Sequence, residues 1–255
     1  MQSSRTVPPV TNARLLGRQD MNVGTDYENT VQQMLIAVDV DGTLFDGEKV
    51  AYAAERALGE ASADGHSLII VTGRRWESLR AVVPSVLGLF DRVVCEEGGV
   101  MVNVASGELT LLAEPVEQGL VAALQAAGVP ELDVGHVVVG APSEYLTLVT
   151  EVRNQMRSER HIVVNKGSVA LAPPGCDKGT GLQAAVAALG LEGLPIIAIG
   201  DAANDLPMFA IATIAVGVAN ADDAVRASGV QLTAAAAGLG VAEALQRHLP
   251  RRPSG

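Results

Sequence analysis

The sequence predicts an α/β fold, in which a Rossmann-like, doubly wound parallel sheet carries an inserted α+β cap domain. Short aliphatic and β-branched runs alternate with Ala- and Leu-rich stretches of helical period, which is the pattern of βα units. The runs are apolar throughout, as expected for parallel strands that are buried on both faces. Asp39, Thr72 and Asp201 each follow such a run directly. Because the carboxyl ends of parallel strands form one crevice, we expect these side chains to meet there.

The core is expected to comprise residues 34–112 and 173–250. Leu182, Val186 and Leu189 illustrate the helical spacing of apolar residues in one of its segments. The predicted strands are 35–38, 68–71, 92–95, 196–199, 214–216 and 230–232. The predicted helices, which should cover the sheet, are 49–62, 76–87, 181–189, 205–211 and 241–249.

Residues 113–172 interrupt this alternation and predict the α+β cap domain. An insertion of about 60 residues falls in the lower range of domain sizes. The connection after Asp41 is too short for a second cap, so this insertion alone would close over the site. The predicted order is helix 116–126, strand 137–139, helix 144–157, strand 162–164 and strand 168–171.

The composition limits the classes of partner. The chain has 255 residues, 48% of them apolar, which is enough to fill a core and a smaller module. Its 18 basic and 29 acidic residues give a net charge of −11, which repels nucleic acid and anionic lipid. We therefore expect neither nucleic acid nor a membrane as a partner. A small anionic molecule stays possible where a metal and a few cations supply local positive charge.

The cysteines, histidines and apolar runs indicate a cytoplasmic protein. Cys95 and Cys176 are too few for a disulfide framework, and the four histidines lack zinc-ligand spacing. No apolar run reaches the length of about 18 residues that a membrane span needs, and no continuous apolar segment suggests secretion. We expect a monomer or homodimer with a disordered lead at 1–33 and a tail at 251–255.

The segment after the first strand predicts a site for an anion. Side chains alternate along an extended backbone, so Asp39 and Asp41 point to one side while Val40 points into the sheet. Gly42 and Thr43 permit a tight turn whose N–H groups can approach an anion closely. Such a turn is suited to bind a phosphoryl group.

Asp201 and Asp205 bring two more carboxylates to the same crevice. Two like charges at about 4 Å repel by roughly 4 kcal/mol at an effective dielectric constant near 20, so four carboxylates cannot gather without a cation. Oxygen ligands with no His or Cys nearby favour Mg²⁺, which also bridges to phosphate oxygens. The sequence therefore predicts a magnesium site.

Four motifs, in order and spacing, resemble those of the haloacid dehalogenase (HAD) superfamily. They are Asp39-x-Asp41-Gly42-Thr43, Thr72-Gly73-Arg74, Gly175-x-Asp177-Lys178-Gly179 and Gly200-Asp201-x-x-Asn204-Asp205. The cap between the second and third motifs is similar to the C2-type (subclass IIB) cap of the Cof-like branch. The resemblance covers about residues 34–249. It implies a HAD-like core and the activity of a HAD-type phosphatase, a phosphoric monoester hydrolase that uses Mg²⁺.

The resemblance also implies a role for each matching residue. Asp39 would be the nucleophile that becomes a phospho-aspartate, and Asp41 would act first as an acid and then as a base. Thr72 would donate to a phosphoryl oxygen, and Lys178 would neutralise charge beside Asp39. Substrate binding is implied for Gly42, Thr43, Gly73, Arg74 and Asn204. Metal binding is implied for Asp39, Asp41 through its backbone carbonyl, Asp201 and Asp205.

Glu97 departs from the family pattern, since Cof-like relatives usually carry Asn at this position. If its side chain lines the site, strongly anionic substrates are disfavoured; if it faces water, nothing follows. The sequence leaves both alternatives open. Cap side chains that could contact a leaving group, unless they form a solvated surface, are Arg153, Asn154, His161 and Lys166.

The expected function is Mg²⁺-dependent hydrolysis of a small phosphorylated metabolite, such as a sugar phosphate or a short phospho-acid like phosphoglycolate. Two alternatives stay open. A phosphosugar mutase would pass the phosphoryl group to a second hydroxyl instead of water, and a non-catalytic protein would only bind phosphorylated ligands. An isolated Asp-x-Asp-Gly turn is usually a solvated loop, but the four motifs together favour catalysis.

Overall fold

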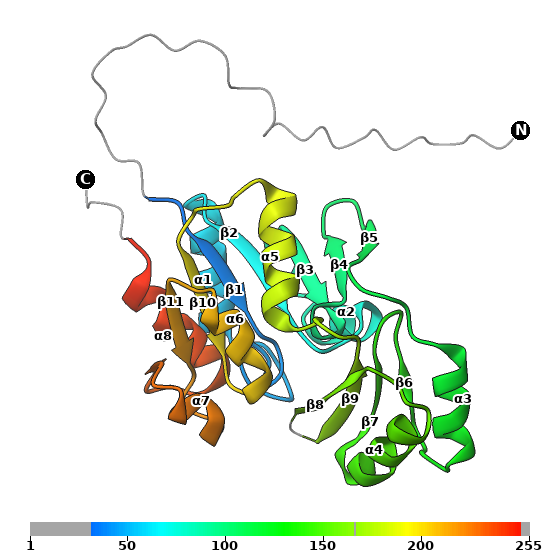
Figure 1. The fold of residues 1–255 in the computed structure, drawn as a ribbon. Coiled ribbons are helices and arrows are strands. Elements are labelled where there is room, and N and C mark those ends of the chain that lie inside the picture. Colours follow the sequence, from blue (N-terminus) through cyan, green and yellow to red (C-terminus); the bar gives the residue numbers. More distant parts are fainter. Residues whose placement is uncertain (1–31, 166, 251–255) are drawn as a thin grey trace, which may run out of the picture. The chain divides into compact units, whose positions relative to one another are not determined.

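The computed structural model describes residues 32–165 and 167–250 (Figure 1). The predicted tail at 251–255 and all but the last two residues of the predicted lead lie outside this part of the chain. The described residues form two β-sheets, one of eight strands and one of four. None of the described helices is both long and apolar enough to cross a membrane.

The larger sheet is parallel over most of its width. Its strands are β1 (Leu35–Val38), β2 (Ser67–Val71), β3 (Arg92–Cys95), β4 (Val100–Asn103), β5 (Leu109–Leu111), β10 (Ile196–Gly200), β11 (Ile214–Gly217) and β12 (Gln231–Leu232). They lie in the order β12-β11-β10-β1-β2-β3-β4-β5. Every pair from β12 to β3 is parallel, so the carboxyl ends of these strands share one edge.

Helices cover both faces of this sheet. The α-helices of the core are α1 (Tyr52–Ala63), α2 (Trp76–Val82), α5 (Lys178–Leu189), α6 (Leu206–Ala210), α7 (Asp223–Ala227) and α8 (Ala237–His248). Short 3₁₀ helices are η1 (Leu87–Leu89), η2 (Glu96–Gly98) and η4 (Ala203–Asp205) in the core, and η3 (Ser143–Tyr145) in the inserted segment.

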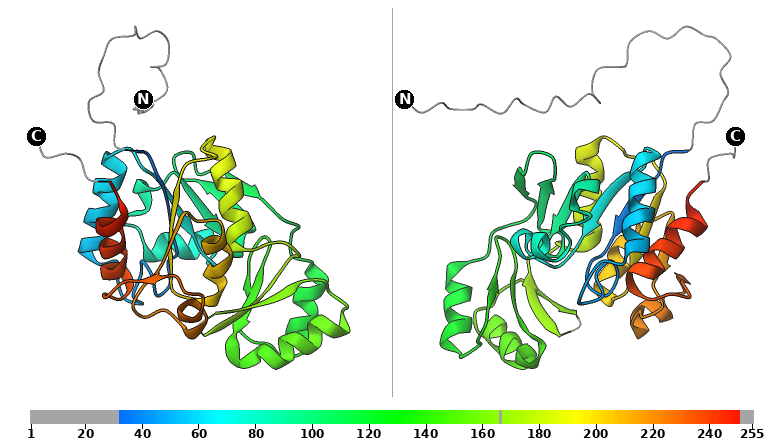
Figure 2. Two further views of the ribbon diagram at one scale, coloured as in Figure 1. Left: turned by 60° about the vertical axis from the view of Figure 1, so that its left-hand side comes forward. Right: turned by 180° about the vertical axis from the view of Figure 1, so that it is seen from behind.

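The two faces follow from the alternation of side chains along β1. Ile36 and Val38 join the apolar cluster that contains residues of α1, α2 and α8. Leu35 and Ala37 join a second cluster, with residues of α5, α6 and α7. Figure 2 (left) shows α1 and α8 on one side of the sheet and α5 on the other. The predicted doubly wound α/β fold is confirmed.

The smaller sheet belongs to the inserted segment and is antiparallel. Its strands are β6 (Asp133–Val134), β7 (Val139–Pro142), β8 (His161–Asn165) and β9 (Ser168–Ala172), in the order β6-β7-β9-β8. Its helices are α3 (Gln118–Ala126) and α4 (Leu146–Gln155), which pack with the sheet in an apolar cluster of their own. The α+β character of the insertion is as predicted, and its boundaries at 113 and 172 stay a prediction.

Some elements differ from the prediction for local physical reasons. The helix predicted at 76–87 stops at Val82, because Pro84 disfavours helical conformation at Val83, the residue before it. The strand predicted at 137–139 begins only at Val139, because the N–H groups of Val137 and Val138 donate to the Glu96 carboxylate instead of to a strand. The sheet is also not wholly parallel, since β4 and β5 form an antiparallel edge.

Arg160 organises the point where the chain enters the insertion. Its side chain is 2% exposed. The guanidinium donates to the carbonyl oxygens of Val137 (2.6 Å) and Pro115 (2.8 Å) and to the carboxylate of Glu117 (2.7 Å). Buried carbonyl groups need such donors, because leaving one unpaired costs about 1–3 kcal/mol.

Replacing Arg160 with Ala is therefore expected to lower the free energy of unfolding by about 2–3 kcal/mol. Equilibrium urea denaturation measures this change. Arg56→Ala is the matched control, because Arg56 lies in an exposed pair with Glu60 (3.7 Å), and exposed ion pairs contribute less than about 1 kcal/mol. Equal losses in the two variants would contradict the structural role of Arg160.

Candidate active site

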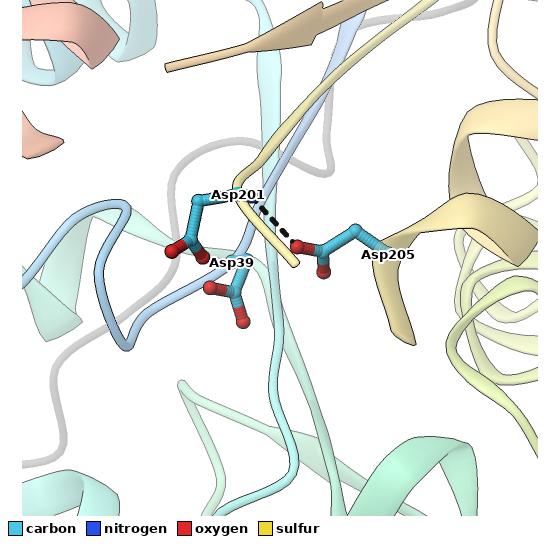
Figure 3. Close-up of side chains that lie close together, drawn as sticks. All are labelled: Asp39, Asp201 and Asp205. Atoms are coloured by element: carbon cyan, nitrogen blue, oxygen red, sulfur yellow. Dashed lines mark hydrogen bonds between the residues drawn. The ribbon is translucent and has the colours of Figure 1, made fainter. Parts of the chain in front are cut away.

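Three carboxylates meet at the carboxyl ends of two neighbouring strands. Asp39 follows β1, Asp201 follows β10, and Asp205 ends the short helix η4. Since β1 and β10 are hydrogen-bonded to each other, their ends lie side by side. Oxygen atoms of the three carboxylates lie within 4.8 Å of one another, and all three residues are buried (Figure 3). The strand-end positions in the sequence predicted this convergence.

Lys178 supplies the positive charge at the centre of this group. Its Nζ lies 2.6 Å from Asp39 Oδ1 and 2.6 Å from Asp205 Oδ1, and its side chain is 1% exposed. The lysine is the first residue of α5, which begins with a capping box between Asp177 and Thr180. The cap fixes the start of the helix, and with it the direction of the lysine side chain.

The buried charges change the ionisation of one another. Burial raises the pKa of Asp39, with the charges of Asp205 and Asp201 acting in the same direction and Lys178 opposing them. Burial acts to lower the pKa of Lys178, but the charges of Asp205, Asp39 and Glu97 outweigh it and raise that pKa. Lys178 is thus ammonium at neutral pH. When all three buried carboxyl groups are ionised, the single ammonium leaves two negative charges uncompensated within this group.

This donor set fits a divalent cation. Its ligand atoms are all carboxylate oxygens, which suit Mg²⁺, and the two uncompensated charges match the charge of the ion. Neighbouring groups orient the carboxylates. Asp205 Oδ2 accepts from the N–H groups of Asp201 (2.8 Å) and Ala202 (3.0 Å), and Asp201 Oδ1 accepts from the hydroxyl of Thr43 (3.0 Å).

The carboxylate of Asp41 lies outside this group and faces Arg74. Two guanidinium nitrogens of Arg74 donate to the two carboxylate oxygens of Asp41, at 2.7 Å and 2.6 Å. The hydrogen bonds to Asp41 raise the pKa of Arg74. Arg74 also donates to Ser78 Oγ (2.9 Å) and stacks over the ring of Phe45 at 5.9 Å. In this conformation Arg74 positions the carboxylate of Asp41. The sequence did not indicate that these two residues form a pair.

The turn after Asp41 differs in one respect from its predicted role. The N–H groups of Gly42 and Thr43, which were expected to approach an anion, donate to the carbonyl oxygens of Phe45 (2.9 Å) and Val40 (3.2 Å) inside the turn. Thr43 contributes instead through its hydroxyl group, on Asp201. Thr72 is fully buried, and its Oγ1 accepts from the N–H of Arg74 (3.2 Å), which leaves its own hydroxyl proton to donate elsewhere.

Glu97 points into the site, which settles the alternative that the sequence left open. Its side chain lines a cavity of about 430 Å³ together with Asp39 and Asp41. Both of its carboxylate oxygens accept from Asn204 Nδ2, at 3.2 Å and 3.1 Å. Burial raises the pKa of Glu97, while Lys178 and Asn204 oppose the shift. Gly73 lies against the same carboxylate, because a Cβ there would be 2.1 Å from Oε1.

Sequence reasoning missed two residues that support the site. Asn220 Nδ2 donates to the carbonyl oxygen of Gly42 at 2.8 Å and so holds the turn. Glu96 accepts from the N–H groups of His136 (3.1 Å), Val137 (2.7 Å) and Val138 (3.1 Å), which lie in the inserted segment. Asn220 follows the end of β11, so its strand-end position was a usable signal. No comparable signal identified the contacts of Glu96.

The comparisons with known proteins define the family. A sequence model of the haloacid dehalogenase-like hydrolases matches residues 36–126 and 132–245, which is most of the chain. The chain therefore belongs to the haloacid dehalogenase-like hydrolase family. The predicted resemblance is confirmed, including the α+β cap of the Cof-like branch.

Individual relatives cover nearly the whole of the chain. A phosphoglycolate phosphatase from Nitrosopumilus maritimus is 28% identical, over 86% of this chain and 98% of the relative. A phosphoglycolate phosphatase from Methanothermobacter thermautotrophicus is 32% identical, over 84% of this chain and 98% of the relative. A solved haloacid dehalogenase-like hydrolase from Bacteroides thetaiotaomicron shares the fold, with a TM-score of 0.72, 19% identity and coverage of 84% and 99% of the two chains.

Gly42→Ala is expected to abolish most of the thermal stabilisation that binding of a divalent cation such as Mg²⁺ would give. A Cβ at Gly42 would lie 2.3 Å from Asp201 Oδ2, so the carboxylate must move. For the unchanged protein, Mg²⁺ at about 100 times its Kd should raise Tm by about 5 °C or more. Gly47→Ala is the matched control, because Gly47 also has positive φ (+103°) but no atom within 4 Å of the added Cβ. Equal shifts in both variants would exclude Asp201 from the metal site.

Proposed function

We propose that this protein is a Mg²⁺-dependent phosphatase that hydrolyses a small phosphorylated metabolite through a phospho-aspartate at Asp39. The observation that carries the proposal is the contact of Lys178 with Asp39 (2.6 Å) inside a buried group of three carboxylates. A carboxylate held beside a fixed ammonium, at the carboxyl edge of a parallel sheet, suits attack on a dianionic phosphoryl group.

The residues proposed to hold Mg²⁺ are Asp39, Asp201 and Asp205, with the backbone carbonyl of Asp41 as the implied fourth ligand. When bound, the ion supplies positive charge to the phosphoryl oxygens and cancels the repulsion between them and the carboxylates. Asp205 has a second task, because it fixes Lys178 and the backbone of Asp201 through its two oxygens. Thr43 orients Asp201 from the opposite side.

The chemistry of the chain's own residues then follows in two steps. Once Arg74 releases it, Asp41 takes up a proton from solvent. A carboxylate oxygen of Asp39 then attacks phosphorus, the bond from phosphorus to the leaving oxygen breaks, and Asp41 gives that oxygen its proton. Asp41, now a carboxylate, takes a proton from a water molecule whose oxygen attacks phosphorus, and the bond from phosphorus to the Asp39 oxygen breaks. Inorganic phosphate leaves, and both aspartates return to their starting states. Lys178 and the hydroxyl of Thr72 are proposed to hold the phosphoryl group during both steps.

The proton transfer requires a change at Arg74. In the structure Arg74 occupies both carboxylate oxygens of Asp41. For Asp41 to give or take a proton, the guanidinium must release at least one of them. Arg74 is thus proposed to hold Asp41 until substrate arrives, and its implied contact with substrate would begin at that release.

The names of the relatives support a small substrate. The two relatives described above are phosphoglycolate phosphatases, and the cavity beside Asp39 has a volume of about 430 Å³. Pockets for small molecules typically span about 300–1,000 Å³. We propose a sugar phosphate or a short phosphorylated acid as the substrate class.

Asp39→Asn is the direct test of the phospho-aspartate. An amide cannot attack phosphorus, so phosphate release from p-nitrophenyl phosphate with Mg²⁺ should fall by at least about 1,000-fold. EDTA should remove the activity of the unchanged protein, and Mg²⁺ should restore it. The control is Asp223→Asn, an exposed aspartate on α7, for which we expect full activity. Unchanged turnover in Asp39→Asn would eliminate the mechanism.

A further inference from the structure

We propose that Glu97 is a specificity-determining residue, and that it selects phosphate esters of neutral polyols or sugars over those of carboxylic acids. This inference rests on the proposed phosphatase function and narrows its substrate class. It assigns a role to a side chain that the two proposed chemical steps do not use.

The backbone directs the Glu97 side chain into the cavity. Glu96, Glu97 and Gly98 have consecutive positive φ angles of 52°, 55° and 102°. A left-handed conformation is unfavourable for a residue with a Cβ, so it persists only where the surroundings impose it. Contacts of the two residues that flank Glu97 impose this conformation. Three N–H groups of the insertion hold the Glu96 carboxylate, and a Cβ at Gly98 would lie 1.9 Å from the carbonyl oxygen of Asp177.

The carboxylate of Glu97 therefore has a fixed place beside the phosphate-binding groups. Glu97 is 6% exposed, and its carboxylate lies against Gly73, the residue that follows Thr72 in the chain. A phosphoryl group near Asp39 and Thr72 places its leaving group in the same cavity that Glu97 lines. The charge of Glu97 is thus within the space that a leaving group must use.

The described lining of this cavity carries an excess of negative charge. The described lining includes six acidic side chains but only two arginines, Arg74 and Arg75. Arg74 pairs with Asp41 until its proposed release, and Arg75 pairs with Asp133. Lys178, deeper in the site, already contacts Asp39 and Asp205. A second negative charge on the substrate would meet this excess negative charge, and like charges in close contact repel each other strongly.

A hydroxyl group meets the opposite situation. Glu97 lines the cavity, and Asn204 Nδ2 donates to both of its carboxylate oxygens, which fixes the direction of the side chain. A carboxylate oxygen can accept more than one hydrogen bond, so hydroxyl groups of a polyol can donate to Glu97, whereas a carboxylate has no proton to donate.

Two matched substrate pairs test the inference. Phosphoglycolate and 2-hydroxyethyl phosphate differ only by a carboxylate in place of a hydroxymethyl group, as do 3-phosphoglycerate and glycerol 3-phosphate. We expect kcat/KM to favour the hydroxyl member of each pair by at least about 10-fold, a factor that corresponds to about 1.4 kcal/mol. Glu97→Gln keeps the size of the side chain and removes its charge. In this variant the kcat/KM values of the two members of each pair should differ by no more than about threefold, chiefly because KM for the carboxylate member falls.

The controls separate this inference from general effects. Glu108→Gln removes the same charge from an exposed position before β5 and should leave the ratios unchanged. If Glu97→Gln is unstable by thermal denaturation, Glu97→Asn tests the same point, because Asn tolerates positive φ well. Preference of the unchanged protein for the carboxylate members, or ratios unaltered in a folded Glu97 variant, would overturn the inference. Absence of turnover on all four esters and on p-nitrophenyl phosphate would instead refute the proposed phosphatase function.

Discussion

The ammonium group of Lys178 lies 2.6 Å from both Asp39 and Asp205, and the arrangement of the site depends on these contacts. Acidic groups as buried as these cannot ionise together without a partner, because burial removes the water that would solvate them. The N-terminus of α5 places that partner, Lys178, beside the carboxylates. The capping box fixes its first turn, and Gly179 lets α5 approach α6 closely, since a Cβ there would lie 2.6 Å from the carbonyl oxygen of Pro207.

Glycines explain how so many carboxylates reach one small volume. A Cβ at Gly42 would lie 2.3 Å from Asp201 Oδ2, one at Gly73 would lie 2.1 Å from Glu97 Oε1, and one at Gly200 would lie 2.5 Å from Asp205 Oδ2. Each of these acidic side chains thus packs against backbone that carries no side chain. The glycines of the motifs serve the packing of the acids, and only Gly42 among the three also needs its positive φ of +81°.

The sequence was most predictive for the strands and side chains whose position follows from the course of the backbone. Strands β1 and β3 begin and end where predicted, because their apolar runs are buried on both faces. Asp39, Asp201, Asp205 and Lys178 meet because strand ends and a helix start deliver them. The edge strand β5 was missed because it is largely exposed and lacks a continuous apolar run. The pairs Arg74–Asp41 and Glu97–Asn204 were missed because they depend on side-chain directions, which no motif spacing encodes.

The left-handed pair Glu96–Glu97 has a consequence for how related enzymes can diverge. The carboxylate of Glu96 accepts from the backbone of the inserted segment, while Glu97 lines the cavity together with Asp39. The direction of side chain 97 is set by the backbone around it and not by its own chemistry. If Glu97 selects the substrate as proposed, point substitution at 97 is expected to alter selectivity while the contacts of Glu96 with the inserted segment are kept. An inserted or deleted residue there would displace both side chains at once. We therefore expect this short turn to accept a different residue at 97 but not a change in its length.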